Sequence, residues 1–228
     1  MLFTKFSEIS RKKKNKLFFS RIRPDETTRV IDIGSQVGTK YSEGIQFLDI
    51  YPWKKNVTAV NLSPQHIKNI RKKYPGVNAQ TADALNLPWP DQYFDVAYSN
   101  AVIEHVGGAE AQRKFASEVM RVAKKYFITT PNRWYPFEFH LRLPFVSWLP
   151  GNAYLKVGSI VRFNHIQKKY MWFAGEFNKF NLLSKRQLSA YFPNSTIIAC
   201  RVTFMPETFI AVSSDVTPHR VAAENSGS

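Results

Sequence analysis

The chain has 228 residues, and its 32 Lys and Arg outweigh 17 Asp and Glu to give a formal net charge of +15. With 44% hydrophobic and 14% aromatic residues it can bury a sizeable core, which excludes disorder as the main state. No apolar run approaches the roughly 20 residues that span a bilayer, so we expect neither a membrane-spanning nor a secreted protein. The single Cys200 excludes a disulfide framework and a cysteine-based zinc site, and it fits a reducing, cytoplasmic compartment.

The positive charge is concentrated in two segments. Residues 1–24 hold eight basic residues and one acidic residue, and residues 132–190 hold nine and two. Residues 25–131 are nearly balanced in charge, with thirteen basic and eleven acidic residues. For any single lysine run a solvated surface is the plainer explanation. An anionic partner, if there is one, is therefore expected to meet the two basic segments.

Short β-branched runs and turn residues predict alternating strands and helices from residue 29 onward. Alternation of this kind is typical of a mostly parallel sheet that has helices on both faces and binds ligands at the carboxyl ends of its strands. We expect strands at 29–33, 57–61, 77–81, 94–98 and 126–130, a short helix before Pro52, a helix from the Ser63-Pro64 cap to about Lys73, and an amphipathic helix over 109–124.

The pattern changes after Pro131. An aromatic, proline-punctuated stretch over 132–183 predicts a lid or substrate-side insertion after the fifth strand. Beyond it, Ser184 is expected to cap a short helix that ends at Tyr191, and two late runs, 195–204 and 207–213, predict an antiparallel pair.

These elements predict an α/β fold with a doubly wound, Rossmann-like, mostly parallel seven-stranded sheet and an antiparallel terminal strand. The expected organisation is a basic N-terminal arm over 1–24, a single domain over 25–214 and a flexible tail over 215–228.

The turn after the first strand is the first candidate site. In Val30-Ile31-Asp32-Ile33-Gly34-Ser35-Gln36-Val37-Gly38, glycine lets the backbone turn sharply and approach a ligand. Two glycines four residues apart do not match the G-x-G-x-x-G pattern of dinucleotide sites, and no Lys-Ser/Thr follows as in a P-loop. Alone, the segment is equally compatible with an ordinary strand-to-helix turn and with a ligand-binding turn.

Three later segments follow this turn in a characteristic order. They are Val57 to Ser63, then Ala82-Asp83-Ala84-Leu85-Asn86-Leu87-Pro88-Trp89-Pro90-Asp91, then Tyr93-Phe94-Asp95-Val96-Ala97-Tyr98-Ser99-Asn100-Ala101-Val102-Ile103-Glu104-His105-Val106. From about Arg29 to Asn132 the chain resembles the class I S-adenosylmethionine-dependent methyltransferases, particularly the methyltransferase type 11 group. Their usual forms are a D-x-G-x-G-x-G turn, an acid ending the second strand, a D-A-x-x-L-P-[FW]-P-D block, an F-D-V strand and an L-E-H-V continuation.

The resemblance implies S-adenosyl-L-methionine as the cofactor and methyl transfer as the reaction, with no metal ligands assigned. It also implies a cofactor role for nine residues. Asp32, Gly34, Ser35, Gly38 and Asn100 would surround the methionine part, Asn61 and Leu62 would face the ribose and adenine, and Asp83 and Ala84 would bind the adenine.

Two positions depart from the family pattern. Gln36 stands at the middle glycine of the turn, and Asn61 replaces the usual acid. A hydrogen bond to a charged group contributes roughly 1.5–3 kcal/mol, against 0.5–1.5 for a neutral one. We therefore expect cofactor affinity to fall about fivefold without being abolished.

Catalytic residues are harder to identify, because positioning alone can supply up to roughly 7–11 kcal/mol of the barrier reduction in methyl transfer. A general base adds about 10²–10⁴-fold. His140, in Pro136-Phe137-Glu138-Phe139-His140, is the candidate base, and Glu138 is the residue expected to orient it. A packing or surface histidine is the alternative. We expect His105 to shape the pocket floor and His66 to face solvent.

The insertion is rich in aromatic residues after Thr130-Pro131-Asn132. Such rings can flank a flat acceptor or attract a sulfonium by cation–π interaction. We expect most of them to pack the lid on the sheet and one or two to face substrate. They are Trp134, Tyr135, Phe137, Phe139, Phe145, Trp148 and Tyr154.

These observations favour a methyltransferase that acts at oxygen on a small-molecule or glycan- or lipid-linked acceptor. The two basic segments favour an anionic acceptor or membrane surface. Residues 11–19 could contact anionic lipid, where each basic residue contributes about 1 kcal/mol. The alternatives are an RNA methyltransferase acting on ribose or rRNA and a non-catalytic protein with the same fold. Base-amine and pyrimidine-carbon chemistry are disfavoured, because the fourth strand lacks N/D-P-P-Y/F and Cys200 does not follow proline.

Overall fold

The computed structural model describes residues 2–38, 45–150, 153–164, 167, 169–173 and 180–214, with side chains from residue 6 onward. The tail predicted over 215–228 lies outside the described residues. The helices are α1 (Leu2–Ile22), α2 (Phe47–Ile50), α3 (Pro64–Lys73), α4 (Ala109–Val122), α5 (Ala153–Ile160) and α6 (Lys185–Tyr191), with 3-10 turns η1 (Lys54–Asn56), η2 (Ile103–His105) and η3 (Val146–Trp148). The strands are β1 (Val30–Ile33), β2 (Val57–Asn61), β3 (Asn78–Thr81), β4 (Phe94–Asn100), β5 (Ala123–Pro131), β6 (Phe137–Glu138), β7 (Leu143–Pro144), β8 (Val161–Asn164), β9 (Lys169–Trp172), β10 (Ser195–Arg201) and β11 (Pro206–Ser213).

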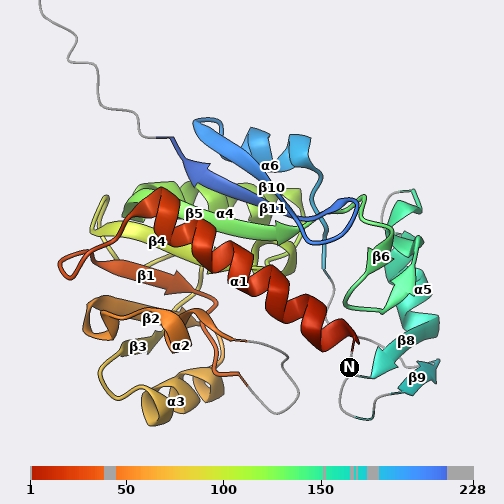
Figure 1. Ribbon diagram of the computed structural model, residues 1–228, viewed down its shortest axis with the longest axis horizontal. Coiled ribbons are helices and arrows are strands. Elements are labelled where there is room, and N and C mark those ends of the chain that lie inside the picture. Colours follow the sequence, from red (N-terminus) through yellow and green to blue (C-terminus); the bar gives the residue numbers. More distant parts are fainter. Residues whose placement is uncertain are drawn as a thin grey trace, which may run out of the picture.

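Seven strands form one sheet in the order β10-β11-β5-β4-β1-β2-β3, as Figure 1 shows. Strands β1 to β5 pair in parallel, and β11 is antiparallel to both β5 and β10. The predicted mostly parallel sheet with an antiparallel terminal strand is confirmed. The strand order reverses between β1 and β4, and the carboxyl ends of strands at such a switch point are where ligands bind.

Both faces of the sheet are buried, which explains why its central strands are almost continuous apolar runs. On one face, the sheet residues Tyr98 and Phe127 belong to a buried cluster with Phe47 of α2. The other packs against α4, where Phe115, Val119 and Val122 are all fully buried at the predicted helical spacing.

The first 22 residues, expected to be a basic arm, contain a helix that packs on the sheet. Ser10, Lys14, Phe18 and Ile22 are buried four residues apart, so they form one stripe along α1. The Phe18 ring is fully buried and edge-on to those of Phe47, Tyr98 and Phe127, with centroids 5.2 to 5.5 Å apart. Within residues 11–19, Phe18 therefore belongs to the protein core. The run of lysines concealed this stripe in the sequence.

The insertion after β5 has a small core of its own. Leu141, Val146, Tyr154, Phe180 and Leu182 are buried together. Two short antiparallel pairs, β6 with β7 and β8 with β9, accompany η3 and α5 around it. The insertion lies at one end of the sheet in Figure 1, and it starts where β5 ends.

The two predicted helix caps differ in detail. Ser184 forms a capping box with Gln187, since its side chain accepts from the Gln187 backbone N–H at the start of α6. Ser63 occupies the cap position of α3 and is followed by a proline, but its side chain makes no capping hydrogen bond. Among the described residues, no helix combines the length and the apolar character that crossing a membrane requires.

Candidate functional site

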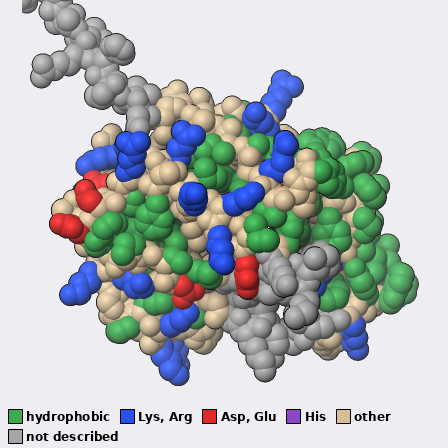
Figure 2. Space-filling view, viewed as in Figure 1, with side chains coloured by type: hydrophobic (Ala, Val, Ile, Leu, Met, Phe, Trp, Pro, Cys, Tyr) green, Lys and Arg blue, Asp and Glu red, His purple; other side chains and the backbone are tan. Residues whose placement is uncertain are grey.

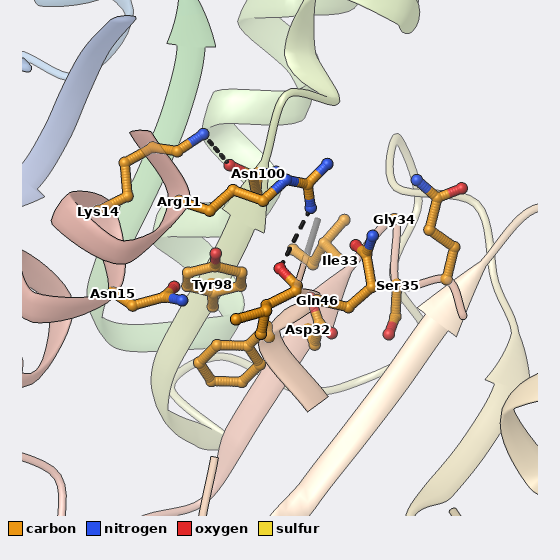
Figure 3. A pocket seen from close by; sticks show the side chains of 13 residues that line it. Arg11, Lys14, Asn15, Asp32, Ile33, Gly34, Ser35, Gln46, Tyr98 and Asn100 are labelled. Atoms are coloured by element: carbon orange, nitrogen blue, oxygen red, sulfur yellow. Dashed lines mark hydrogen bonds between the residues drawn. The ribbon is translucent and has the colours of Figure 1, made fainter. Parts of the chain in front are cut away.

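A small pocket lies at the carboxyl ends of β1 and β4 (Figure 3). Its walls come from α1, the turn after β1, residues 45–47 and the end of β4. The cavity volume is about 30 Å³. Of the residues predicted to hold the cofactor, Asp32, Gly34, Ser35 and Asn100 line this pocket, whereas Gly38, Asn61, Leu62, Asp83 and Ala84 do not.

Gly34 makes the sharp turn that leaves β1. Its φ angle is +79°, a conformation that favours glycine, and a Cβ at this position would lie 2.3 Å from Val102 Cγ2. The backbone N–H groups of Gly34 and Ser35 both donate to the carbonyl of Val60, at 2.9 and 3.0 Å. The turn is therefore tied to the end of β2, and it leaves no room for a side chain at residue 34.

Asp32 places a carboxylate at the bottom of the pocket. It lies in a strand whose four residues are all buried, and its own exposure is 4%. Burial raises the pKa of Asp32 to about 7, because the ionised form is poorly solvated there. A carboxylate in this position is suited to a cationic ligand group.

The burial of Asp32 makes stability depend on pH. The pKa of Asp32 is about 7 in the folded chain and near 3.8 when unfolded, so the favourable contribution of the protonated form is complete below about pH 4 and is lost as pH rises through 7. In urea unfolding, the free energy of unfolding of Asp32→Asn should rise relative to that of the wild type by on the order of 4 kcal/mol between about pH 4 and pH 8. A difference between the two proteins that stays constant with pH would contradict this assignment.

Two cations from α1 reach into the same pocket, and sequence reasoning missed both. Lys14 Nζ donates to Asn100 Oδ1 at 2.8 Å, and Arg11 Nη1 donates to the carbonyl of Ile45 at 3.3 Å (Figure 3). Thr129 Oγ1 holds the same Asn100 oxygen at 2.9 Å. Burial lowers the pKa of Lys14 to about 8. The four-residue spacing of the buried stripe on α1 was the available signal.

The structure gives a reason for the replacement of the usual acid by Asn61. Its Nδ2 donates to the carbonyl of Ser35 at 2.8 Å, and its Oδ1 accepts from the N–H of Ser63. A carboxylate has no donor for that carbonyl. Asn61 therefore links the end of β2 to the turn after β1.

The remaining predicted cofactor residues lie near the ends of β2 and β3. Leu62 is 70% exposed, and Asp83 is exposed with Oδ1 accepting from the N–H of Leu85 at 2.9 Å. Gln36, which stands where the family pattern has its middle glycine, is one of the residues that line the pocket.

An ion pair on α4 holds the segment that contains Asp83. The Leu87 N–H donates to Glu118 Oε2 at 2.7 Å. Arg121 contacts Glu118 through two nitrogens, and it also donates to the carbonyls of Leu87 and Trp89. Glu118 is nearly fully buried, so this network ties residues 87–89 to a rigid helix.

His140 and Glu138 are brought together as predicted. His140 Nδ1 lies 2.6 Å from Glu138 Oε1, and its Nε2 lies 3.2 Å from His105 Nε2. Burial alone would lower the pKa of His140, but the hydrogen bond and charge of Glu138, with Glu104, raise it above the ordinary value. His105 is not a lining residue of the pocket at Asp32, and His66 is half-buried on α3 rather than fully in solvent.

The aromatic residues of the insertion divide into buried and exposed groups. Tyr135 and Tyr154 are buried, and Phe137 and Phe139 are half-buried. Trp134, Phe145 and Trp148 are about half exposed. An open groove of about 700 Å³ includes Trp134 and Trp148 together with Arg133, Lys185 and Arg186.

Comparison with known proteins agrees with this architecture. Residues 35–127 match the family model described as a methyltransferase domain. A curated protein of Mycobacterium tuberculosis, named "Probable S-adenosylmethionine-dependent methyltransferase MT3114", is 30% identical over 79 residues. That match covers 35% of this chain and only 29% of the relative.

Solved structures resemble the chain over a greater length. The PH0226 protein of Pyrococcus horikoshii aligns with a TM-score of 0.58 at 18% identity, covering 89% of this chain and 88% of that one. A SAM-dependent methyltransferase of Methanosarcina mazei aligns with a TM-score of 0.52 at 15% identity, covering 83% and 92%. At such identities the likeness concerns the fold. The sheet order agrees with this fold, and residues 35–127 resemble a methyltransferase domain.

Proposed function

We propose that this protein is a methyltransferase that uses S-adenosylmethionine and methylates an oxygen of a small-molecule or glycan- or lipid-linked acceptor. The observation that carries the proposal is the pocket at the switch point of the sheet, where Asp32, Gly34 and Asn100 meet. When bound, the cofactor supplies an electrophilic methyl group on its sulfonium.

The charges around this pocket suit the two ends of a methionine moiety. The buried carboxylate of Asp32 can accept from an ammonium group, and Arg11 and Lys14 can donate to a carboxylate. Asp83, with its segment held by Arg121, is the candidate for the adenine amino group.

The acceptor part of the proposal is supported by the surface of the insertion. Arg133 of the insertion, with Lys185 and Arg186 at the start of α6, makes the neighbouring groove positive, and two tryptophans offer faces on which a ring can stack. Figure 2 shows hydrophobic side chains gathered over the insertion side of the molecule. The most exposed of the apolar residues in this segment are Phe145, Trp172 and Phe173. An anionic acceptor with an apolar portion fits this surface.

The decisive measurement for the cofactor is calorimetry with S-adenosylhomocysteine. We expect binding by the wild type and a loss of about 10-fold or more in Arg11→Ala and Lys14→Ala, since a charge-assisted hydrogen bond contributes roughly 1.5–3 kcal/mol. Lys12→Ala and Lys16→Ala are the matched controls, because these lysines are exposed on the same helix. Asp83→Ala should also weaken binding. Undetectable binding at millimolar ligand would instead support a non-catalytic protein.

The acceptor class can be separated by transfer of a labelled methyl group into fractionated cell extract. We expect label in a glycan or organic-soluble lipid fraction that is stable to ribonuclease. Label that is lost on ribonuclease treatment, with retention on RNA that falls steeply with salt, would favour the RNA alternative.

A further inference from the structure

A second cluster of ionisable side chains lies beside the pocket at the carboxyl ends of β4 and β5. Glu104 and His105 belong to η2, directly after β4, and His140 follows β6 in the insertion. One ligand atom from each of these three residues lies within 4.8 Å of the others. His105 is exposed, His140 is half-buried and Glu104 is fully buried. The site is therefore open on one side.

The pair of imidazoles has the separation expected of two ligands on one ion. The Nε2 atoms of His105 and His140 are 3.2 Å apart and face each other. With metal–nitrogen bonds of about 2.0–2.1 Å, that separation corresponds to an angle of roughly 100° at the metal, between octahedral and tetrahedral values.

Neighbouring side chains hold these ligands in orientation. Glu138 Oε1 lies 2.6 Å from His140 Nδ1, and its other oxygen accepts from the N–H of Leu141. A carboxylate on Nδ1 directs the lone pair of Nε2 outward, as in carboxylate–histidine–metal arrangements. Thr130 Oγ1 donates to Glu104 Oε2 at 3.1 Å and fixes the second carboxylate.

Glu104 supplies an independent observation. Its Oε1 is buried and has no hydrogen-bond partner among the described residues. A buried polar atom without a partner costs roughly 1–3 kcal/mol, and more when the group is charged. A cation bound beside it would supply the missing partner, and a doubly charged one would balance the carboxylates of Glu104 and Glu138.

We propose that Glu104, His105 and His140 bind a divalent transition-metal ion, with Glu138 as the positioning residue of His140. Two imidazoles and one carboxylate favour Zn²⁺, Mn²⁺, Fe²⁺ or Co²⁺ over Mg²⁺ and Ca²⁺, which prefer oxygen ligands. Three protein ligands leave coordination positions open on the exposed side of His105, where an oxygen of an acceptor can bind.

The site also lies next to the cofactor pocket. Adjacent residues of β5 contact both sites. Thr129 Oγ1 donates to Asn100 Oδ1, and Thr130 Oγ1 donates to Glu104 Oε2. A metal at this position would select acceptors that carry a hydroxyl or carboxylate oxygen. The proposal does not depend on cofactor binding, so it can be tested separately.

The experiment is metal titration of tag-free, chelator-stripped protein. Zn²⁺ affinity is measured by competition with a chromophoric chelator, and Co²⁺ is followed by its visible absorption. We expect one ion per chain with a Kd below about 1 µM. His105→Ala and His140→Gln should weaken binding at least 100-fold and abolish the Co²⁺ bands, and Glu138→Gln should weaken it about 10–100-fold.

His66→Gln is the matched control, because it removes a histidine on α3, which packs beside β2 and β3 and away from the insertion (Figure 1). It should leave the affinity unchanged. His105 is exposed, so His105→Ala is expected to fold, and circular dichroism checks this for every variant. Absent binding, or a stoichiometry other than one ion per chain, overturns the proposal. So does wild-type affinity in His105→Ala and His140→Gln, or a loss of affinity in His66→Gln as large as in those two variants. Mg²⁺ binding as tight as Zn²⁺ binding also overturns it. If no metal binds, the two histidines are a hydrogen-bonded pair, and His140 is again the candidate base.

Discussion

Gly34→Ala should abolish S-adenosylhomocysteine binding and lower the free energy of unfolding by about 2–4 kcal/mol. Two costs add at this residue. A non-glycine residue at a φ of +79° is strained by about 1 kcal/mol or more, and its Cβ would lie 2.3 Å from Val102 Cγ2. Relief requires a shift of the turn that supplies Gly34 and Ser35 to the pocket, so affinity and stability fall together.

Gly76→Ala is the matched control. A Cβ there would lie 3.7 Å from Lys55 Cγ, an ordinary contact, and we expect a change within about 0.5 kcal/mol. Urea unfolding and calorimetry measure the two effects. If Gly34→Ala bound ligand like the wild type, the turn after β1 would not be part of the cofactor site.

Arg121→Ala is expected to lower the free energy of unfolding by about 2–4 kcal/mol and to weaken S-adenosylhomocysteine binding. The substitution leaves the buried Glu118 carboxylate without its guanidinium partner and removes the donor from the carbonyls of Leu87 and Trp89. The segment that contains Asp83 would lose its anchor to α4. Cofactor affinity should therefore fall although Arg121 lines no wall of the pocket at Asp32.

Arg113→Ala removes an exposed arginine from the same helix and should change stability by less than about 0.5 kcal/mol. The double variant Glu118→Gln, Arg121→Ala should recover part of the lost stability, because the unpaired buried charge is then removed. Equal stability of Arg121→Ala and Arg113→Ala would show that the network does not anchor the segment.

The core elements of the sheet were predictable because their signals are local. Val57–Asn61 and Pro64–Lys73 have the predicted bounds, and the helical spacing of Phe115, Val119 and Val122 identified the buried face of α4. Strand β4 extends to Asn100, two residues beyond the expected end, because its pairing with β5 continues through Ser99 and Asn100. Pairing with a neighbouring strand is not visible in a single segment.

The N-terminal helix shows a signal that composition concealed. Basic residues at 11–14 suggested a solvated arm, yet Lys14 and Phe18 share a buried stripe, and tertiary contacts with Asn100 and Tyr98 decide where they lie. A charged side chain can be buried when a polar partner meets its head group, and the partner here lies 86 residues away along the chain.

By itself, the sequence determined the α/β class, the succession of strands and helices along the chain up to the fifth strand, and the turn at Gly34, since periodicity, glycine and short motifs act over a few residues. Only the tertiary structure decided what closes the pocket and what surrounds His140. The two histidines are 35 residues apart, and their approach depends on how the insertion packs against the end of β4. Long-range packing of this kind leaves no periodic trace, because each contact is made by a single side chain.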